Sequence, residues 1–200
     1  MIQAQEIELK KLTPNKGQIE GVPTNPRKAT KRAIENMKKS IEETPLMLEV
    51  NELTAVRIAD LDAKGALGVT YIGKEGKSTG ILLNSKFFDR KRKTIEKDVI
   101  AGYNSGFKNR TNRPLQHTIT HELAHATWNA SMSSTKAKAA GKEISALYKK
   151  WMKDDKKKGY GAYGRTSVSE FFAEGVTKAI HGNADKYTKK LKKIVSKYQL

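Results

Sequence analysis

Three of the four histidines in the chain fall within nine residues, in the segment HTITHELAHATW at 117–128. Inside it, His121-Glu122-Leu-Ala-His125 has the form H-E-x-x-H. Residues four apart lie on the same face of a helix, so both imidazoles can reach one ion. A nitrogen of each ring would lie about 2.0 to 2.1 Å from a bound zinc ion. The spacing therefore predicts a metal site on a helix, with His121 and His125 as ligands.

Glu122 follows the first of these histidines, so its carboxylate is expected to stand beside the ion and not on it. Zinc lowers the pKa of a bound water toward about 7. A carboxylate next to that water can accept its proton and pass it to a leaving amine. This arrangement predicts peptide-bond hydrolysis, with Glu122 as the general base.

A third protein ligand must come from elsewhere in the chain, and there is no cysteine to supply it. The metzincin pattern is excluded, because Trp128 stands where that pattern has glycine and Ser131 where it has histidine. The remaining candidates are Glu143, Glu170, Glu174 and His181.

Glu170 and Glu174 lie four apart in the segment YGAYGRTSVSEFFAEG at 160–175, so they share one face of a predicted helix. One carboxylate can bind the ion, while the other accepts the N–H of a ligand histidine and orients its ring. The stretch Ser167-Val-Ser-Glu170 also has the form of a capping box, in which the glutamate bonds the N-terminal amide of the helix.

Two segments, 117–128 and 160–175, resemble the zinc peptidase domain of anthrax lethal factor and its relatives, a branch of the gluzincins. The resemblance rests on the H-E-x-x-H motif and on Y-G-R-T-x-x-x-E-F-F-A-E, which begins at Tyr163. Ala124 is a difference, since the family often has glycine before the second histidine. Similar domains occur in bacterial toxins and mobile elements, so the resemblance implies a prokaryotic or phage setting, with delivery by such a system as one route.

The resemblance implies a role for each matching residue. Glu170 would be the third zinc ligand, beside the two motif histidines. Tyr163 would assist the oxyanion or the leaving group, and Glu174 would hold a ligand histidine in place. The implied protein is a zinc metalloendopeptidase with one Zn²⁺ per chain and a protein or peptide substrate.

The two other histidines have plainer interpretations. His117 lies one turn before His121, but four residues of a helix turn by about 400°, so the two side chains are offset by about 40° around the axis. We therefore expect His117 to be a neighbour of the site and not a ligand. His181 falls in the last turn of a predicted helix, where the dipole favours its charge. Alternatively, His181 is the third ligand of a SprT-like protease, a group that also carries HELxHA segments.

The net charge is +18, and residues 61–200 hold 29 Lys and Arg against 12 Asp and Glu. A field of this sign favours acidic partners. The alternative function is therefore a basic DNA-associated protein, either a SprT-like protease of DNA-bound proteins or a non-catalytic nucleic-acid binder. The motif around Glu170, and the lack of cysteines for a zinc ribbon, favour the peptidase instead.

The 200 residues fit one domain. No apolar run is long enough to cross a bilayer, and the start MIQAQEIELKK lacks the apolar core of a secretion signal. We therefore expect a cytoplasmic monomer without a membrane span.

The expected fold is an α+β domain of zincin type, a small twisted sheet and the H-E-x-x-H helix over a helical C-terminal half. Residues 1–25 are predicted to be an extended arm, and 26–200 the peptidase domain. The predicted strands are Leu46–Val56, Leu67–Ile72 and Gly80–Leu83, the last two joined by a turn at 73–76. The predicted helices cover about 26–44, 95–103, 114–128, 135–152, 167–181 and the C-terminus.

Two further expectations concern how these elements serve the site. In the helix at 114–128, Ile119, Leu123 and Ala126 share a face, with the motif histidines on roughly the opposite side. The strand Gly80–Asn84 is the candidate for a sheet edge that pairs with an extended substrate.

Overall fold

The computed structural model describes residues 24–25, 56–61, 67–72, 78–131, 135–154 and 160–198. Helices dominate these residues and accompany one small sheet, so the fold is broadly α+β, as expected. Several predicted features lie outside the described residues: the arm before residue 24, the helix at 26–44, the strand at 46–55 and the turn at 73–76.

The described strands are β1 (Thr24–Asn25), β2 (Val56–Leu61), β3 (Gly68–Ile72) and β4 (Ser78–Asn84). They lie in the order β1-β2-β4-β3, with β4 parallel to β2 and antiparallel to β3. The predictions of strands at 67–72 and 80–83 are confirmed.

The prediction that Gly80–Asn84 forms a sheet edge is wrong. β4 has a hydrogen-bonded neighbour on each side, because β2, from a segment more than twenty residues earlier, pairs with it. Ile81 and Leu83 on β4 are fully buried, which suits a central strand. In the described sheet, the outermost strand next to β4 is β3.

The helices are α2 (Ser85–Phe88), α3 (Arg92–Asn104), α4 (Pro114–Ser131), α5 (Thr135–Met152), the 3-10 turn η2 (Ala162–Arg165), α6 (Val168–His181) and α7 (Lys186–Tyr198). The predicted helices within the described residues are confirmed, whereas α2 and η2 were not predicted. Among the helices that the structure describes, none combines the length and apolar character that crossing a bilayer requires.

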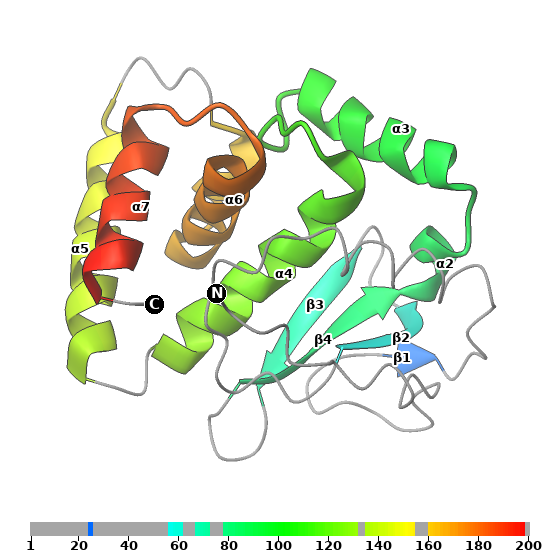
Figure 1. Ribbon diagram of the computed structural model, residues 1–200, viewed down its shortest axis with the longest axis horizontal. Coiled ribbons are helices and arrows are strands. Elements are labelled where there is room, and N and C mark those ends of the chain that lie inside the picture. The colour runs from blue at the N-terminus through cyan, green and yellow to red at the C-terminus, as the bar shows by residue number, and fades with distance from the viewer. Residues whose placement is uncertain are drawn as a thin grey trace.

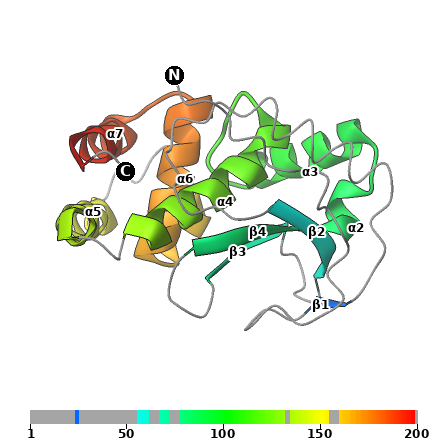
Figure 2. The ribbon, with the colours of Figure 1, turned by 60° about the horizontal axis from the view of Figure 1, so that its bottom comes forward.

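Helix α4 lies between the sheet and the C-terminal helices (Figure 1). Seen from below, it covers the face of β3 and β4 (Figure 2). Its predicted apolar stripe is buried, with Ile119, Leu123 and Ala126 exposing 1%, 4% and 0% of their surfaces. Ala124 belongs to the core of the C-terminal helices. Because two of its faces are packed, α4 holds its motif residues in a fixed position.

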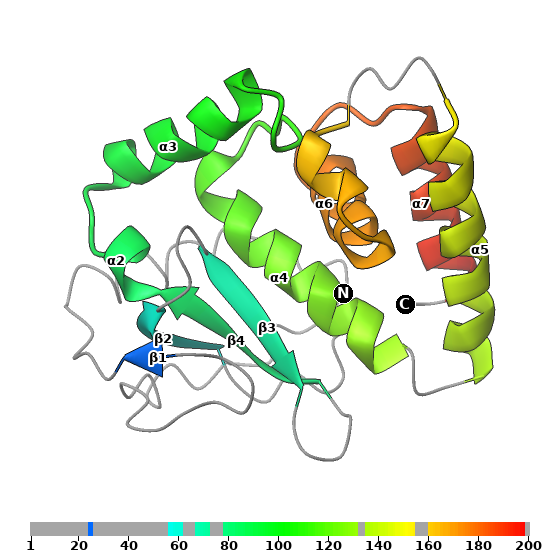
Figure 3. The same cartoon turned by 180° about the vertical axis from the view of Figure 1, so that it is seen from behind.

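Helix α6 lies between α4 and the pair formed by α5 and α7 (Figure 3). Its anchors are Phe171 and Phe172, both fully buried, together with Trp151 of α5 and Leu191 of α7. These apolar contacts fix the rotation of α6 about its axis. The polar side chains that alternate with them are thereby directed at α4.

Candidate metal centre

Helices α4 and α6 bring together His121, His125 and Glu170, a group able to bind a metal ion. The two Nε2 atoms are 3.1 Å apart, and Glu170 Oε2 lies 3.0 Å from Nε2 of His121 and 3.3 Å from Nε2 of His125. Ligand atoms of a tetrahedral ion with bonds of about 2.0 to 2.1 Å lie roughly 3.3 Å from one another. The nearly equilateral triangle therefore fits one such ion.

The oxygen of Glu170 that faces the histidines supports this fit. Oε2 is buried and makes no hydrogen bond to any described residue, although two ring nitrogens lie within 3.3 Å of it. A buried carboxylate oxygen without a donor is costly. A cation shared by the three atoms would satisfy it.

The N-terminus of α6 explains how Glu170 is aimed. Ser167 caps the helix, and its hydroxyl accepts a hydrogen bond of 3.0 Å from the backbone N–H of Glu170. This is half of the predicted capping box. The carboxylate of Glu170 contacts the histidines of α4 instead of completing the box.

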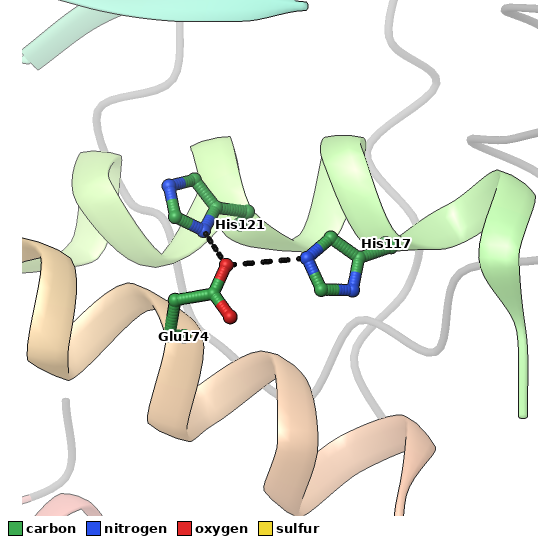
Figure 4. Close-up of side chains that lie close together, drawn as sticks. All are labelled: His117, His121 and Glu174. Atoms are coloured by element: carbon green, nitrogen blue, oxygen red, sulfur yellow. Dashed lines mark hydrogen bonds and ion pairs between the residues drawn. The ribbon is translucent and has the colours of Figure 1, made fainter. Parts of the chain in front are cut away.

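Glu174, one turn further along α6, holds the other nitrogen of the His121 ring (Figure 4). Its Oε1 lies 3.2 Å from Nδ1 of His121 and 3.2 Å from Nε2 of His117. The contact with His121 is short but is not a well-aligned hydrogen bond. Glu174 Oε2 accepts a hydrogen bond of 2.7 Å from the backbone N–H of Asn109. With both oxygens engaged, the carboxylate fixes the orientation of His121.

His117, His121 and Glu174 form a second group that could hold a metal ion. It is more enclosed than the first, because the side chains of His117 and Glu174 are fully buried, whereas Glu170 is 19% exposed. Its atoms also have other partners, since Nδ1 of His117 lies 3.1 Å from the hydroxyl of Tyr103. The outer group, with Glu170, is the one that reaches solvent.

Ser169 was not predicted, yet it contacts a candidate ligand. Its Oγ lies 2.9 Å from Nδ1 of His125, so each motif histidine has a polar partner from α6 on the ring nitrogen that faces away from Glu170. Such partners fix the tautomer and the direction of a metal-binding ring. The position directly before Glu170 was the available signal.

Strand β3 holds the carboxylate of Glu122. Thr70 Oγ1 lies 3.0 Å from Glu122 Oε2 and 2.8 Å from the carbonyl oxygen of the same residue. β3 can approach because Gly68 has no side chain, and a Cβ there would lie 3.0 Å from Cγ of Glu122. Glu122 belongs to neither metal-binding group among the described residues. It directly follows His121 in the chain, so its carboxylate is available for proton transfer beside the group.

Tyr163, in η2, lies against the same group. Its hydroxyl donates a hydrogen bond of 3.3 Å to Glu170 Oε1, and its ring stacks on that of His121 with centroids 5.7 Å apart. Burial, together with the negative charges of Glu170 and Glu122, raises the pKa of the phenol. Tyr163 therefore keeps its proton and can donate a hydrogen bond in the site.

The charges of the group are strongly coupled. Burial favours neutral His121, but the close carboxylates of Glu170 and Glu174 outweigh this and raise its pKa to about 9. Burial likewise favours neutral Glu170, but His121 and His125 lower its pKa to about 2. Without an ion, a proton on His121 neutralises part of the carboxylate charge, and a metal ion would take its place.

His181 is placed in the last turn of α6 as predicted, but the expectation of a charged ring is wrong. Its Nε2 lies 2.8 Å from Thr120 Oγ1, and burial lowers its pKa to about 4. The desolvation of the ring outweighs the helix dipole. Within the described part of the chain, His181 joins neither metal-binding group, so the ligand set of the SprT-like alternative is not assembled there.

Glu143, another candidate for the third ligand, lies away from the histidines. Its carboxylate accepts hydrogen bonds from Lys197 at 2.5 Å and Tyr198 at 2.6 Å. It therefore ties α5 to α7.

Protein-family models, curated proteins and solved structures give no match to this chain.

Proposed function

We propose that this chain is a zinc metalloendopeptidase of the gluzincin class with a zincin-like fold. The observation that carries the proposal is the triangle formed by Nε2 of His121, Nε2 of His125 and Oε2 of Glu170. Catalytic zinc sites use three such nitrogen and oxygen ligands and leave a fourth position for water or substrate. The partial exposure of Glu170 agrees with such an open position.

Each surrounding residue has a role in hydrolysis. Zinc, when bound, lowers the pKa of water and polarises the scissile carbonyl. Glu122, held by Thr70, accepts a proton from the attacking water and delivers it to the leaving nitrogen as the C–N bond breaks. Tyr163 donates a hydrogen bond to the oxygen that gains negative charge. Glu174 keeps the His121 ring directed at the ion.

Strand β3 supports an extended peptide as the substrate. It is the outermost strand of the described sheet on this side, and its Thr70 contacts Glu122. A peptide that pairs with this edge through main-chain hydrogen bonds would run past the metal centre. The net charge of +18 favours an acidic protein or peptide.

The proposal is tested by incubating the zinc-loaded chain with a set of unstructured peptides, beside Glu122→Gln and the matched control Glu143→Gln. The wild type and the control should cleave the same peptides. Glu122→Gln should retain zinc and lose activity on the order of 10²- to 10⁴-fold, because it removes the base without removing a ligand. Cleavage by Glu122→Gln at the wild-type rate would contradict the assigned base.

A further inference from the structure

A separate cavity of about 320 Å³ lies next to the metal centre. It is open to solvent on one side and is lined by the segment 106–112, by Tyr160 and Gly161, and by residues at the end of α3 and near the end of α6. Among the described residues, its lining holds three cationic side chains and three amides and no carboxylate: Lys108, Arg110, Lys178, Asn109, Asn112 and Asn183. This volume is at the lower end of the roughly 300 to 1,000 Å³ of small-ligand sites.

Part of this lining is fixed by existing contacts. Asn109 accepts a hydrogen bond of 2.6 Å from the N–H of Gly161 and donates one of 3.0 Å to the carbonyl of Glu174. Lys178 is buried and pairs with Asp185 at 2.7 Å. The polar atoms of these two side chains therefore already have partners within the protein.

The remaining polar side chains of the lining carry more hydrogen-bond donors than acceptors. Within the described residues, Lys108 and Arg110 make no ion pair, although Arg110 donates a hydrogen bond of 2.7 Å to Oδ1 of Asn104. The side chains of Asn112 and Asn183 are exposed and make no hydrogen bond to a described residue. Lys108 is half-buried, and its burial lowers its pKa in spite of the acidic groups nearby. A partly buried ammonium without a counter-ion is less favourable than one in open water. The described lining of the cavity therefore carries positive charge without a negative partner.

We propose that this cavity binds an oxyanion, a phosphate or carboxylate group, through Lys108 and Arg110 and the neighbouring side-chain amides. Charge-assisted hydrogen bonds from a guanidinium and an ammonium suit both anions. The proposal does not depend on peptidase activity.

The cavity also shares residues with the metal centre. Its lining includes Asn109, whose backbone N–H bonds Glu174, and Tyr103, whose hydroxyl lies 3.1 Å from Nδ1 of His117. An anion held here would contact the groups that position Glu174. Because Glu174 contacts the ring of His121, the anion would also affect the position of that ring.

The test is calorimetric titration of the full chain with inorganic phosphate and, separately, succinate, at constant ionic strength. The variants are Lys108→Met and Arg110→Gln, with Lys93→Met, an exposed lysine of α3, as the matched control. Phosphate or succinate should bind the wild type and the control alike, and about tenfold or more weakly to the two cavity variants. The anion that binds more tightly identifies the chemical source.

Three results would overturn the proposal: no binding of either anion, equal weakening in Lys93→Met, or binding that survives both cavity substitutions, as binding at the metal centre would. Should a variant fail to fold, amide NMR of the wild type decides. Phosphate should then shift the resonances of Gly106, Asn112 and Gly161 saturably, whereas shifts confined to the lysines of α7 would refute the site.

Discussion

Glu174 Oε1 lies 3.2 Å from Nδ1 of His121, while Glu170 Oε2 lies 3.0 Å from Nε2 of the same ring. One imidazole of α4 is therefore held between two carboxylates that are one turn apart on α6. The contact with Glu174 orients the ring. The contact with Glu170 places a carboxylate oxygen and a ring nitrogen around the position proposed for the ion.

Replacement of Glu174 by glutamine should weaken zinc binding by about 10- to 100-fold, because the ring of His121 loses its charged partner. The amide oxygen of glutamine can still accept the bond from Asn109, so the fold should persist. Competition with a chromophoric chelator measures the affinity, and Glu143→Gln, an exposed carboxylate, is the control. Equal zinc affinity in Glu174→Gln and the wild type would remove Glu174 from the metal centre.

Tyr163→Phe should lower kcat by about 10²-fold with little change in KM or zinc content, because in the proposed mechanism the phenol acts on charge that develops in the transition state. The hydrogen bond to Glu170 is long, at 3.3 Å, and leaves the hydroxyl able to change partner. Steady-state kinetics on a cleaved peptide check this. An effect confined to KM would give Tyr163 a binding role instead.

The stability of the metal-free chain should depend on pH through His121. Its pKa rises from 6.5 to about 9 on folding, so its contribution is complete below pH 6.5 and is lost as the pH rises through 9. The pKa of Glu170 falls from 4.5 to about 2, so its contribution is present above pH 4.5 and is lost as the pH falls through 2.

Thermal unfolding measures this dependence. The Tm of the metal-free chain should fall between pH 6.5 and 9. The zinc-loaded chain should show little of this fall, because a ligand histidine is already neutral. Parallel curves for the two forms would contradict the assignment of His121 to the ion.

Local periodicity was sufficient for the helices that carry the site. The stripe of Ile119, Leu123 and Ala126 predicted α4 with its motif histidines on the other side, and the i, i+4 pair of Glu170 and Glu174 predicted which face of α6 is polar. Such patterns are local, so they can be read without knowing the tertiary fold.

Features that depend on distant segments could not be read in the same way. β4 is central because β2 pairs with it, and nothing within Gly80–Asn84 encodes that neighbour. His181 is neutral because burial among residues of distant segments lowers its pKa to about 4. Asn109 has no motif of its own, and its role appears only where its loop meets α6.

Zinc per chain after dialysis, measured by elemental analysis, tests the central claim most directly. Wild type, Glu170→Ala and the control Glu143→Ala should be compared in parallel. The proposed centre predicts close to one zinc in the wild type and in the control, with clear loss in Glu170→Ala. A wild type without zinc would contradict the metallopeptidase, and zinc retained in Glu170→Ala would contradict Glu170 as the third ligand.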